Sequence, residues 1–84
     1  MSDQSIAQRI ESLVQEEHGI LGREQTDASS ADRLDEDRRR LDQISVELDR
    51  CWDLLRQRRA LREAGQNPDE ASVRDANTVE RYVQ

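Results

Sequence analysis

The sequence predicts an all-α protein: an antiparallel two-helix hairpin with a short C-terminal helical or extended tail, dimerising into a four-helix bundle. Apolar residues recur at helical spacing from residue 6 to residue 61, and a short polar loop interrupts them. The chain has 84 residues with one Trp, one Tyr and no Phe, so it has little material for a core and gains from self-association. We expect residues 1–66 to form the hairpin and residues 67–84 to pack on it as a tail.

The first helix is expected over residues 3–24. Ser2 or Asp3 can cap its N-terminus. Its apolar face follows the spacing of an amphipathic helix and consists of Ile6, Ile10, Leu13, Val14, Ile20 and Leu21. Gly19 and Gly22 each disfavour a helix by up to ~1 kcal/mol relative to Ala, so we expect fraying from Gly19 onward.

The second helix is expected over residues 31–64, after a loop whose length suits an antiparallel hairpin. Ser29 or Ser30 can cap its first turn, and Gly65 can adopt the left-handed conformation that ends a helix. At ~100° per residue, one face falls within an arc of about 100°. This face, which we expect to be buried against the first helix, consists of Leu34, Leu41, Ile44, Leu48, Cys51, Trp52 and Leu55.

The loop also sets the register of the two helices. Antiparallel pairing around it places Ile6 opposite Leu48, and Leu13 opposite Leu41 or Asp42, within about one turn. The first helix then ends opposite the middle of the second helix, near residue 51, and the second helix overhangs it.

Leu54 and Leu61 form a second apolar patch on a different face of this overhang, so another element must cover them. Asn67 and Pro68 are typical of the start of a short helix or turn. The tail carries apolar residues that can fold back on the patch, namely Val73, Val79, Tyr82 and Val83. A second chain could cover the same patch, with Trp52, Leu55 and the tail near the join, and we expect a homodimer that uses both covers.

Composition disfavours several classes of partner and indicates a location. The formal net charge of −6 and the pI of about 4.7 disfavour non-specific binding of nucleic acid or of an anionic membrane by the whole molecule. No apolar run has the length of a signal peptide or a membrane span. One cysteine permits no internal disulfide. We therefore expect a cytoplasmic protein that does not enter membranes.

Two residues could carry chemistry. His18 lies beside Glu16 and Glu17, and imidazole with carboxylates can bind a metal. A di-iron bundle needs Glu-x-x-His, however, and adjacent residues point to different faces of a helix. Cys51 lies on the expected buried face, where a thiol is inert. We assign no catalytic residue, metal or cofactor, and we expect no enzymatic activity.

Charged residues at the expected interfaces have two predicted roles. We expect Glu17, Asp37 and Arg38 to form a polar layer that fixes the register of the hairpin. We expect Arg59 or Arg62 to anchor the tail. The carboxylates available for this pairing are those of Asp69, Glu70 and the C-terminus at Gln84.

The arginines between Arg56 and Arg62 suggest nucleic-acid binding as an alternative. They do not form one stripe, because Arg56 and Arg58 lie ~160° apart around the helix. Glu63 can neutralise Arg59 by its spacing of four residues. The chain also lacks aromatic residues in numbers that base stacking requires, so nucleic acid is not the expected partner.

Three stretches resemble a known family. The run VELDRCWDLLRQRRA over residues 46–60, the segment NPDEA over 67–71 and the closing VERYVQ over 79–84 are similar to an actinobacterial family catalogued as domain of unknown function 2630. Residues 10–21 also look like it, and the sequence departs from the family at Gly19 and Gly22, where the family pattern is more favourable to a helix. The resemblance implies a cytoplasmic helical protein without an assigned activity, so no functional residue can be transferred.

The preferred function is a non-enzymatic, self-associating interaction or regulatory module with an unidentified protein partner. The alternative is a nucleic-acid accessory protein that uses the Arg56–Arg62 region. The residues expected to make the interaction are Trp52, Leu54, Leu55, Leu61, Arg58, Arg59, Arg62 and Tyr82.

Overall fold

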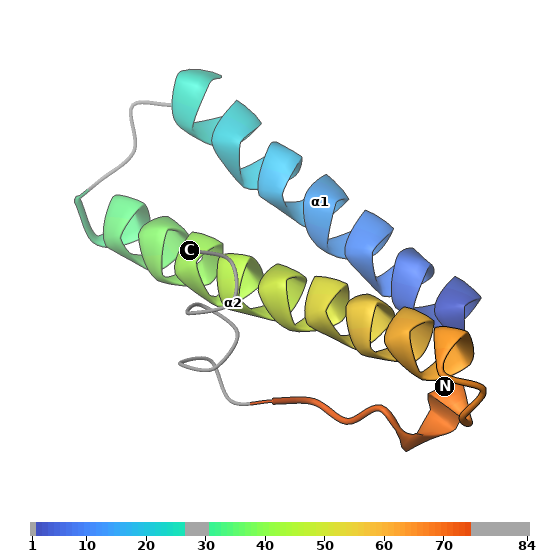
Figure 1. Cartoon of the computed structure of the whole chain (residues 1–84). Coiled ribbons are helices and arrows are strands. Elements are labelled where there is room, and N and C mark those ends of the chain that lie inside the picture. Colours follow the sequence, from blue (N-terminus) through green and yellow to red (C-terminus); the bar gives the residue numbers. More distant parts are fainter. Residues whose placement is uncertain (1, 27–30, 75–84) are drawn as a thin grey trace.

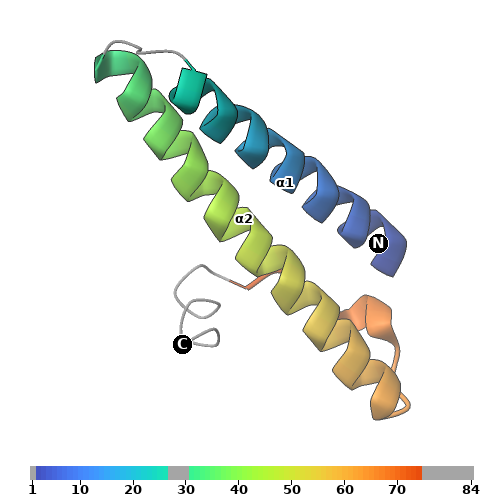
Figure 2. The ribbon, with the colours of Figure 1, turned by 90° about the horizontal axis from the view of Figure 1, so that it is seen from above.

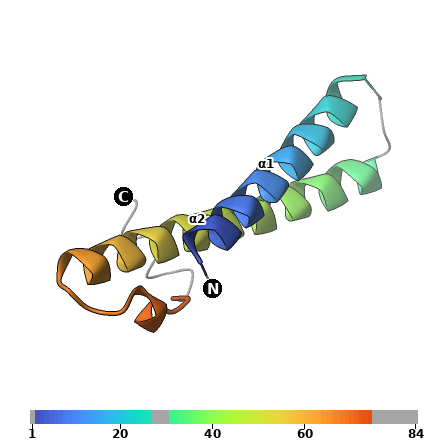
Figure 3. The same cartoon turned by 90° about the vertical axis from the view of Figure 1, so that its right-hand side faces the viewer.

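The computed structural model describes residues 2–26 and 31–74. In this part of the chain, helix α1 (Asp3–Thr26) and helix α2 (Ala31–Glu63) lie side by side in antiparallel directions, and the 3-10 turn η1 (Pro68–Glu70) follows (Figure 1). Figures 2 and 3 show the same pairing from above and from the right-hand side of Figure 1, with η1 beside the C-terminal end of α2. The described residues contain no strand, so the predicted all-α hairpin is confirmed.

Helix α1 begins with a reciprocal cap. The amide of Ser5 donates to the hydroxyl of Ser2 and the amide of Ser2 donates to the hydroxyl of Ser5, both at 3.0 Å. The helix continues through Gly19 and ends at Thr26, two residues beyond the expected end. Fraying from Gly19 is therefore not observed. Ile20 is only 5% exposed because it packs against α2. This packing stabilises the turn that Gly19 and Gly22 weaken.

Helix α2 ends at Glu63 because the chain reverses at a glycine. Gly65 has a φ of +73°, and the amide of Gln66 donates to the carbonyl oxygen of Leu61 at 2.8 Å. The predicted turn then follows: the side chain of Asn67 accepts a hydrogen bond from the amide of Asp69 at 3.0 Å. The cap expected at Ser29 or Ser30 lies outside the described residues.

The core lies along the line where α1 and α2 meet. At its centre, Leu13 is 1% exposed and Ile44 is fully buried, and Ile20 completes this cluster. A second cluster nearer the open end of the hairpin consists of Ile6, Ile10 and Leu54. Leu48 packs against both clusters, and Ile6 lines a hollow with Cys51 and Leu54, about one turn beyond the predicted position opposite Leu48.

The buried face of α2 differs from the predicted one at its edges. Trp52 is 51% exposed and Leu34 is 41% exposed, so neither belongs to the core. Leu54, which was placed in a separate patch, is 6% exposed and is part of it. The reason is geometric: one helix covers only the middle of the arc, and Ala71 covers the edge that carries Leu54, whereas residues 71–74 leave Trp52 half-exposed.

The residues that the structure describes include no helix with the length and apolar character needed to cross a membrane.

Two glycine substitutions test these helix assignments with opposite signs. Gly19→Ala should raise the free energy of unfolding by up to about 1 kcal/mol, because Gly19 lies inside α1 and an added Cβ would meet no atom within 4 Å. Gly65→Ala should lower it by about 1 kcal/mol, because a side chain disfavours the positive φ. Urea unfolding followed by circular dichroism measures both, and equal signs would contradict the assignments.

Candidate interaction surface

Residues 67–74, which we call the strap, pack along α2. Ala71 contacts the cluster of Ile6, Ile10 and Leu54. The side-chain amide of Gln57 donates to the carbonyl oxygen of Ser72 at 2.7 Å and accepts from the amide of Ser72 at 3.3 Å. The backbone amide and carbonyl of Ser72 are thus both satisfied by one side chain of α2.

The strap is also held by a charged contact at its end. Arg74 lies 3.4 Å from the carboxylate of Asp53, which is only 2% exposed. The side chain of Gln57 donates to the same carboxylate at 2.8 Å. This buried acid is therefore stabilised by one neighbour on its own helix and one on the strap.

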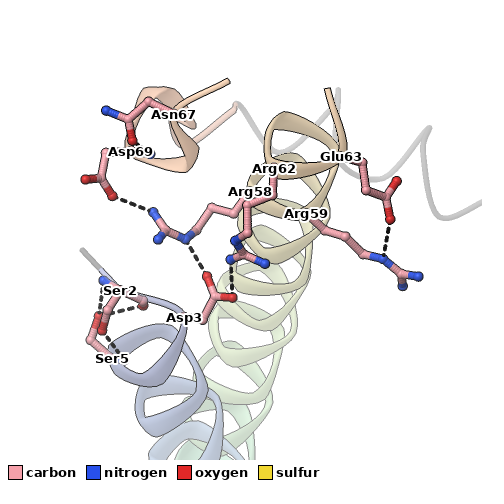
Figure 4. Close-up of polar contacts among 9 residues, drawn as sticks. All are labelled: Ser2, Asp3, Ser5, Arg58, Arg59, Arg62, Glu63, Asn67 and Asp69. Atoms are coloured by element: carbon pink, nitrogen blue, oxygen red, sulfur yellow. Dashed lines mark hydrogen bonds and ion pairs between the residues drawn. The ribbon is translucent and has the colours of Figure 1, made fainter. Parts of the chain in front are cut away.

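One guanidinium joins three parts of the chain at the open end of the hairpin (Figure 4). Arg58 is 8% exposed; it donates to Asp3 at the start of α1 and, at 2.9 Å, to Asp69 in η1. Arg62 also pairs with Asp3. The planar guanidinium has several fixed donors, which suits it to bridge two carboxylates at once.

These contacts shift the acidity of the groups involved. Hydrogen bonds from Arg58 hold the pKa of Asp3 and the pKa of Asp69 below the ordinary value of 3.8. The hydrogen bond to Asp3 in turn raises the pKa of Arg58. All three groups are therefore charged at neutral pH.

For the described residues, the prediction of which arginine anchors the tail was wrong; the predicted pairing with the C-terminus at Gln84 lies outside them. Arg59 or Arg62 was expected to bind a tail carboxylate, but Arg58 binds Asp69. Arg59 pairs instead with Glu63 at 3.1 Å, as its helical spacing predicted. Arg58 projects toward both α1 and η1, whereas Arg62 lies one turn farther along and reaches only the start of α1 in Figure 4.

One side of the hairpin is lined by ion pairs between the helices. Arg9 pairs with Glu47 at 2.6 Å, and Glu16 pairs with Arg40 through two hydrogen bonds. Two turns farther along α1, Arg23 binds Asp37 at 3.2 Å. The α1 members are Arg9, Glu16 and Arg23, spaced by seven residues, so they lie above one another on the helix.

This pairing corrects the expected polar layer of Glu17, Asp37 and Arg38. Asp37 is 7% exposed as such a layer requires, but its carboxylate is bound by Arg23, and Arg38 is exposed. The reason is the rotation of α1 about its axis, which places Arg23 in the row of charged residues beside the seam and therefore next to Asp37.

The other side of the hairpin is apolar. One row of apolar side chains on each helix lies beside the buried seam, on the side opposite the ion pairs, as the turn of ~100° per residue shows. None of them is buried: three are half-buried and three are exposed, including Leu21 at 42% and Leu34 at 41%. We call this surface the open flank; it consists of Ala7, Val14 and Leu21 on α1 and Leu34, Leu41 and Leu48 on α2.

The spacing on the open flank is seven residues on both helices. The clue was therefore present in the sequence, but an amphipathic analysis of one helix at a time assigns these residues to the edge of a core. Only the ion pairs on the opposite side show which edge remains uncovered.

The remaining predicted interaction residues are spread over the surface. Leu55 and Leu61 are half-buried, and Leu55 packs against the cluster that contains Leu54. Trp52 and Leu55 line a shallow hollow of about 280 Å³ together with two arginines, Arg56 and Arg59, which we call the Trp52 hollow. Val73 of the strap is 57% exposed and does not cover the core. Val79, Tyr82, Val83 and Gln84 lie outside the described residues.

The two residues considered for chemistry have ordinary surroundings. Burial raises the pKa of the Cys51 thiol, which keeps it protonated at neutral pH. His18 is exposed. Within residues 2–26 and 31–74, no group of three or more His, Cys, Asp or Glu side chains is arranged to hold a metal ion.

Residues 2–26 and 31–74 thus form a small helical hairpin with a strap, and they leave an apolar flank uncovered. The chain belongs to the family described as "Protein of unknown function (DUF2630)", whose model matches residues 2–84, and the predicted resemblance is confirmed. It is similar to Uncharacterized protein Rv0898c of Mycobacterium tuberculosis (strain ATCC 25618 / H37Rv) and to Uncharacterized protein Mb0922c of Mycobacterium bovis (strain ATCC BAA-935 / AF2122/97).

Each of these mycobacterial relatives is 58% identical over 48 residues, which are 57% of this chain and 55% of the relative. The match therefore spans about half the length of the curated relatives, and both are actinobacterial as the resemblance implied. No solved structure gave a significant match.

Acid should release the strap. Because the pKa of Asp69 is lowered in the folded chain, its ion pair stabilises the fold above about pH 4 and is lost as the pH falls through the lowered value. Asp69→Asn should therefore lower Tm at neutral pH, and the gap to the unmodified protein should close toward pH 2. Melting followed by circular dichroism measures this.

Glu70→Gln is the matched control, since Glu70 lies in the same turn and is exposed. A Tm gap for Asp69→Asn that is the same at both ends of the pH range would contradict the prediction. It would show that the ion pair between Asp69 and Arg58 does not stabilise the fold.

Proposed function

We propose that this protein is a non-enzymatic interaction module that self-associates through the open flank. The observation that carries the proposal is the contrast between its two sides. Ion pairs line one side of the hairpin, whereas half-buried and exposed apolar side chains recur along the other. Apolar rows of this kind on a small monomer mark an interaction surface.

A second copy is the partner that matches this surface. Each copy presents two apolar rows with the same spacing of seven residues, which is the repeat that packs side chains between long helices. A twofold axis would place the flank of one copy on the flank of the other and form a four-helix bundle. Burying a Leu or Val fully contributes about 1.5–3 kcal/mol, and every such contact would occur twice.

The proposal includes a cytoplasmic location, which the lone cysteine supports because it forms no disulfide within the chain. A regulatory role would follow if self-association is coupled to another protein, whose identity this surface does not specify.

Nucleic-acid binding through Arg56–Arg62 receives less support. Arg58 and Arg62 are bound to the carboxylate of Asp3, and Arg59 is bound to Glu63. A phosphate would have to displace these carboxylates, and the net charge of −6 opposes its approach.

Self-association is tested by light scattering or sedimentation over a concentration series. The unmodified protein should have twice the mass of one chain, and Leu21→Glu or Leu34→Glu should give a single chain with unchanged helix content. Both side chains are about 40% exposed in the isolated hairpin, so a carboxylate is tolerated there, whereas it would be buried without a partner in the dimer.

Val73→Glu is the matched control, because Val73 is an exposed apolar residue that lies on the strap and not on the open flank. It should leave the dimer intact. A single-chain mass for the unmodified protein at every concentration would refute the proposal.

The nucleic-acid alternative is tested by fluorescence anisotropy with labelled random RNA and duplex DNA. We expect no binding at physiological ionic strength. Binding that weakens steeply as salt is added, and that is reduced in Arg56→Gln, would instead favour the alternative.

A further inference from the structure

We infer that the Trp52 hollow is the docking site of the chain's own last ten residues, 75–84. The inference concerns a surface separate from the open flank and goes beyond self-association. It rests on the path of the strap, on the lining of the hollow and on the composition of the residues that follow Arg74.

The strap winds around α2 in one direction. Its successive residues contact Arg58 through Asp69, the Leu54 cluster through Ala71, Gln57 through Ser72 and finally Asp53 through Arg74. At ~100° per residue, the α2 positions at these four contacts follow one another around the helix over roughly 140°.

The next positions in the same direction are those of Arg56 and Trp52. The strap is therefore directed toward the Trp52 hollow at the last residue that the structure describes.

Two hollows mark this path. Arg74 lines a small hollow of about 70 Å³ with Asp53, Arg56 and Gln57. The Trp52 hollow, of about 280 Å³, shares Arg56 with it. The two hollows thus share a wall at Arg56, and the second is the next one beyond Arg74 in this direction.

The chemistry of residues 75–84 complements the hollow. The hollow offers the half-exposed indole of Trp52 and the apolar side chain of Leu55, with two arginines at its rim. The last ten residues offer the apolar side chains of Val79, Tyr82 and Val83, and their two acidic residues, Asp75 and Glu80, outnumber the one basic residue, Arg81. Tyr82 and Trp52 would bury apolar surface against each other, and the acids would meet the arginines.

One of the two arginines, Arg59, is accessible to such a segment. The side chain of Arg59 is 78% exposed, and its ion pair with Glu63 lies in solvent, where exchange for another carboxylate costs little. Ten residues span at most about 33 Å when extended, which is ample to reach a hollow that begins beside Arg74.

The test uses Trp52 as its own probe, since it is the only tryptophan in the chain. In the full-length protein, its emission should be blue-shifted and shielded from acrylamide. In the full-length double variant Val79→Ala/Tyr82→Ala, the emission should shift to the red and quenching should rise. Val73→Ala removes an apolar side chain of similar size from the strap and should change neither signal.

Arg56→Glu, with the helix content checked by circular dichroism, should reproduce the double variant. Adding Glu80→Arg to it should restore the shielding. Such a restoration would not follow from a general loss of stability.

Protein concentration separates the possible occupants. Shielding by the chain's own residues is independent of dilution, and it persists in Leu34→Glu, which is designed to be a single chain. Shielding that disappears on dilution would assign the hollow to a second copy and overturn the inference. Identical quenching in the full-length protein and the Val79→Ala/Tyr82→Ala variant would overturn it as well, whatever the mass measured for either.

Discussion

The packing of Leu13 and Ile20 against Ile44 is the contact on which the remaining structure depends. It sets the height and rotation of α1 against α2, because close-packed side chains tolerate little sliding between helices. With this register fixed, Arg9 meets Glu47 and the start of α1 lies beside the end of α2. A shift by one turn would separate each of these pairs, so the polar contacts follow from the apolar ones.

Both ends of the apolar seam are closed by charged residues. Asp37 binds Arg23 near the loop, and Arg58 binds two carboxylates at the open end. Removing such groups from water is costly, and the cost is offset only when partners are in place. A hairpin in the wrong register would leave these charges without partners, so they favour one alignment of the two helices.

The two sides of the hairpin expose different chemistry to their surroundings. Ion pairs cover one side, and the strap completes the cover at Leu54 through Ala71. The open flank and the Trp52 hollow lie on surfaces that these elements leave uncovered. We propose that a second copy covers the open flank and that the chain's own residues 75–84 cover the Trp52 hollow, because a chain of 84 residues gains stability from burying such surfaces.

Local rules in the sequence determined the elements of this protein. Helical periodicity, the Ser2 cap, the Gly65 stop and the Asn67 turn each depend on neighbouring residues, so their positions were predicted to within two residues. Tertiary structure decided which edge of α2 is covered, why Leu54 is buried and Trp52 exposed, and that Arg58 is the arginine that holds the strap. Those outcomes depend on where α1 and residues 67–74 lie in space, and a periodic pattern along one helix does not contain that information.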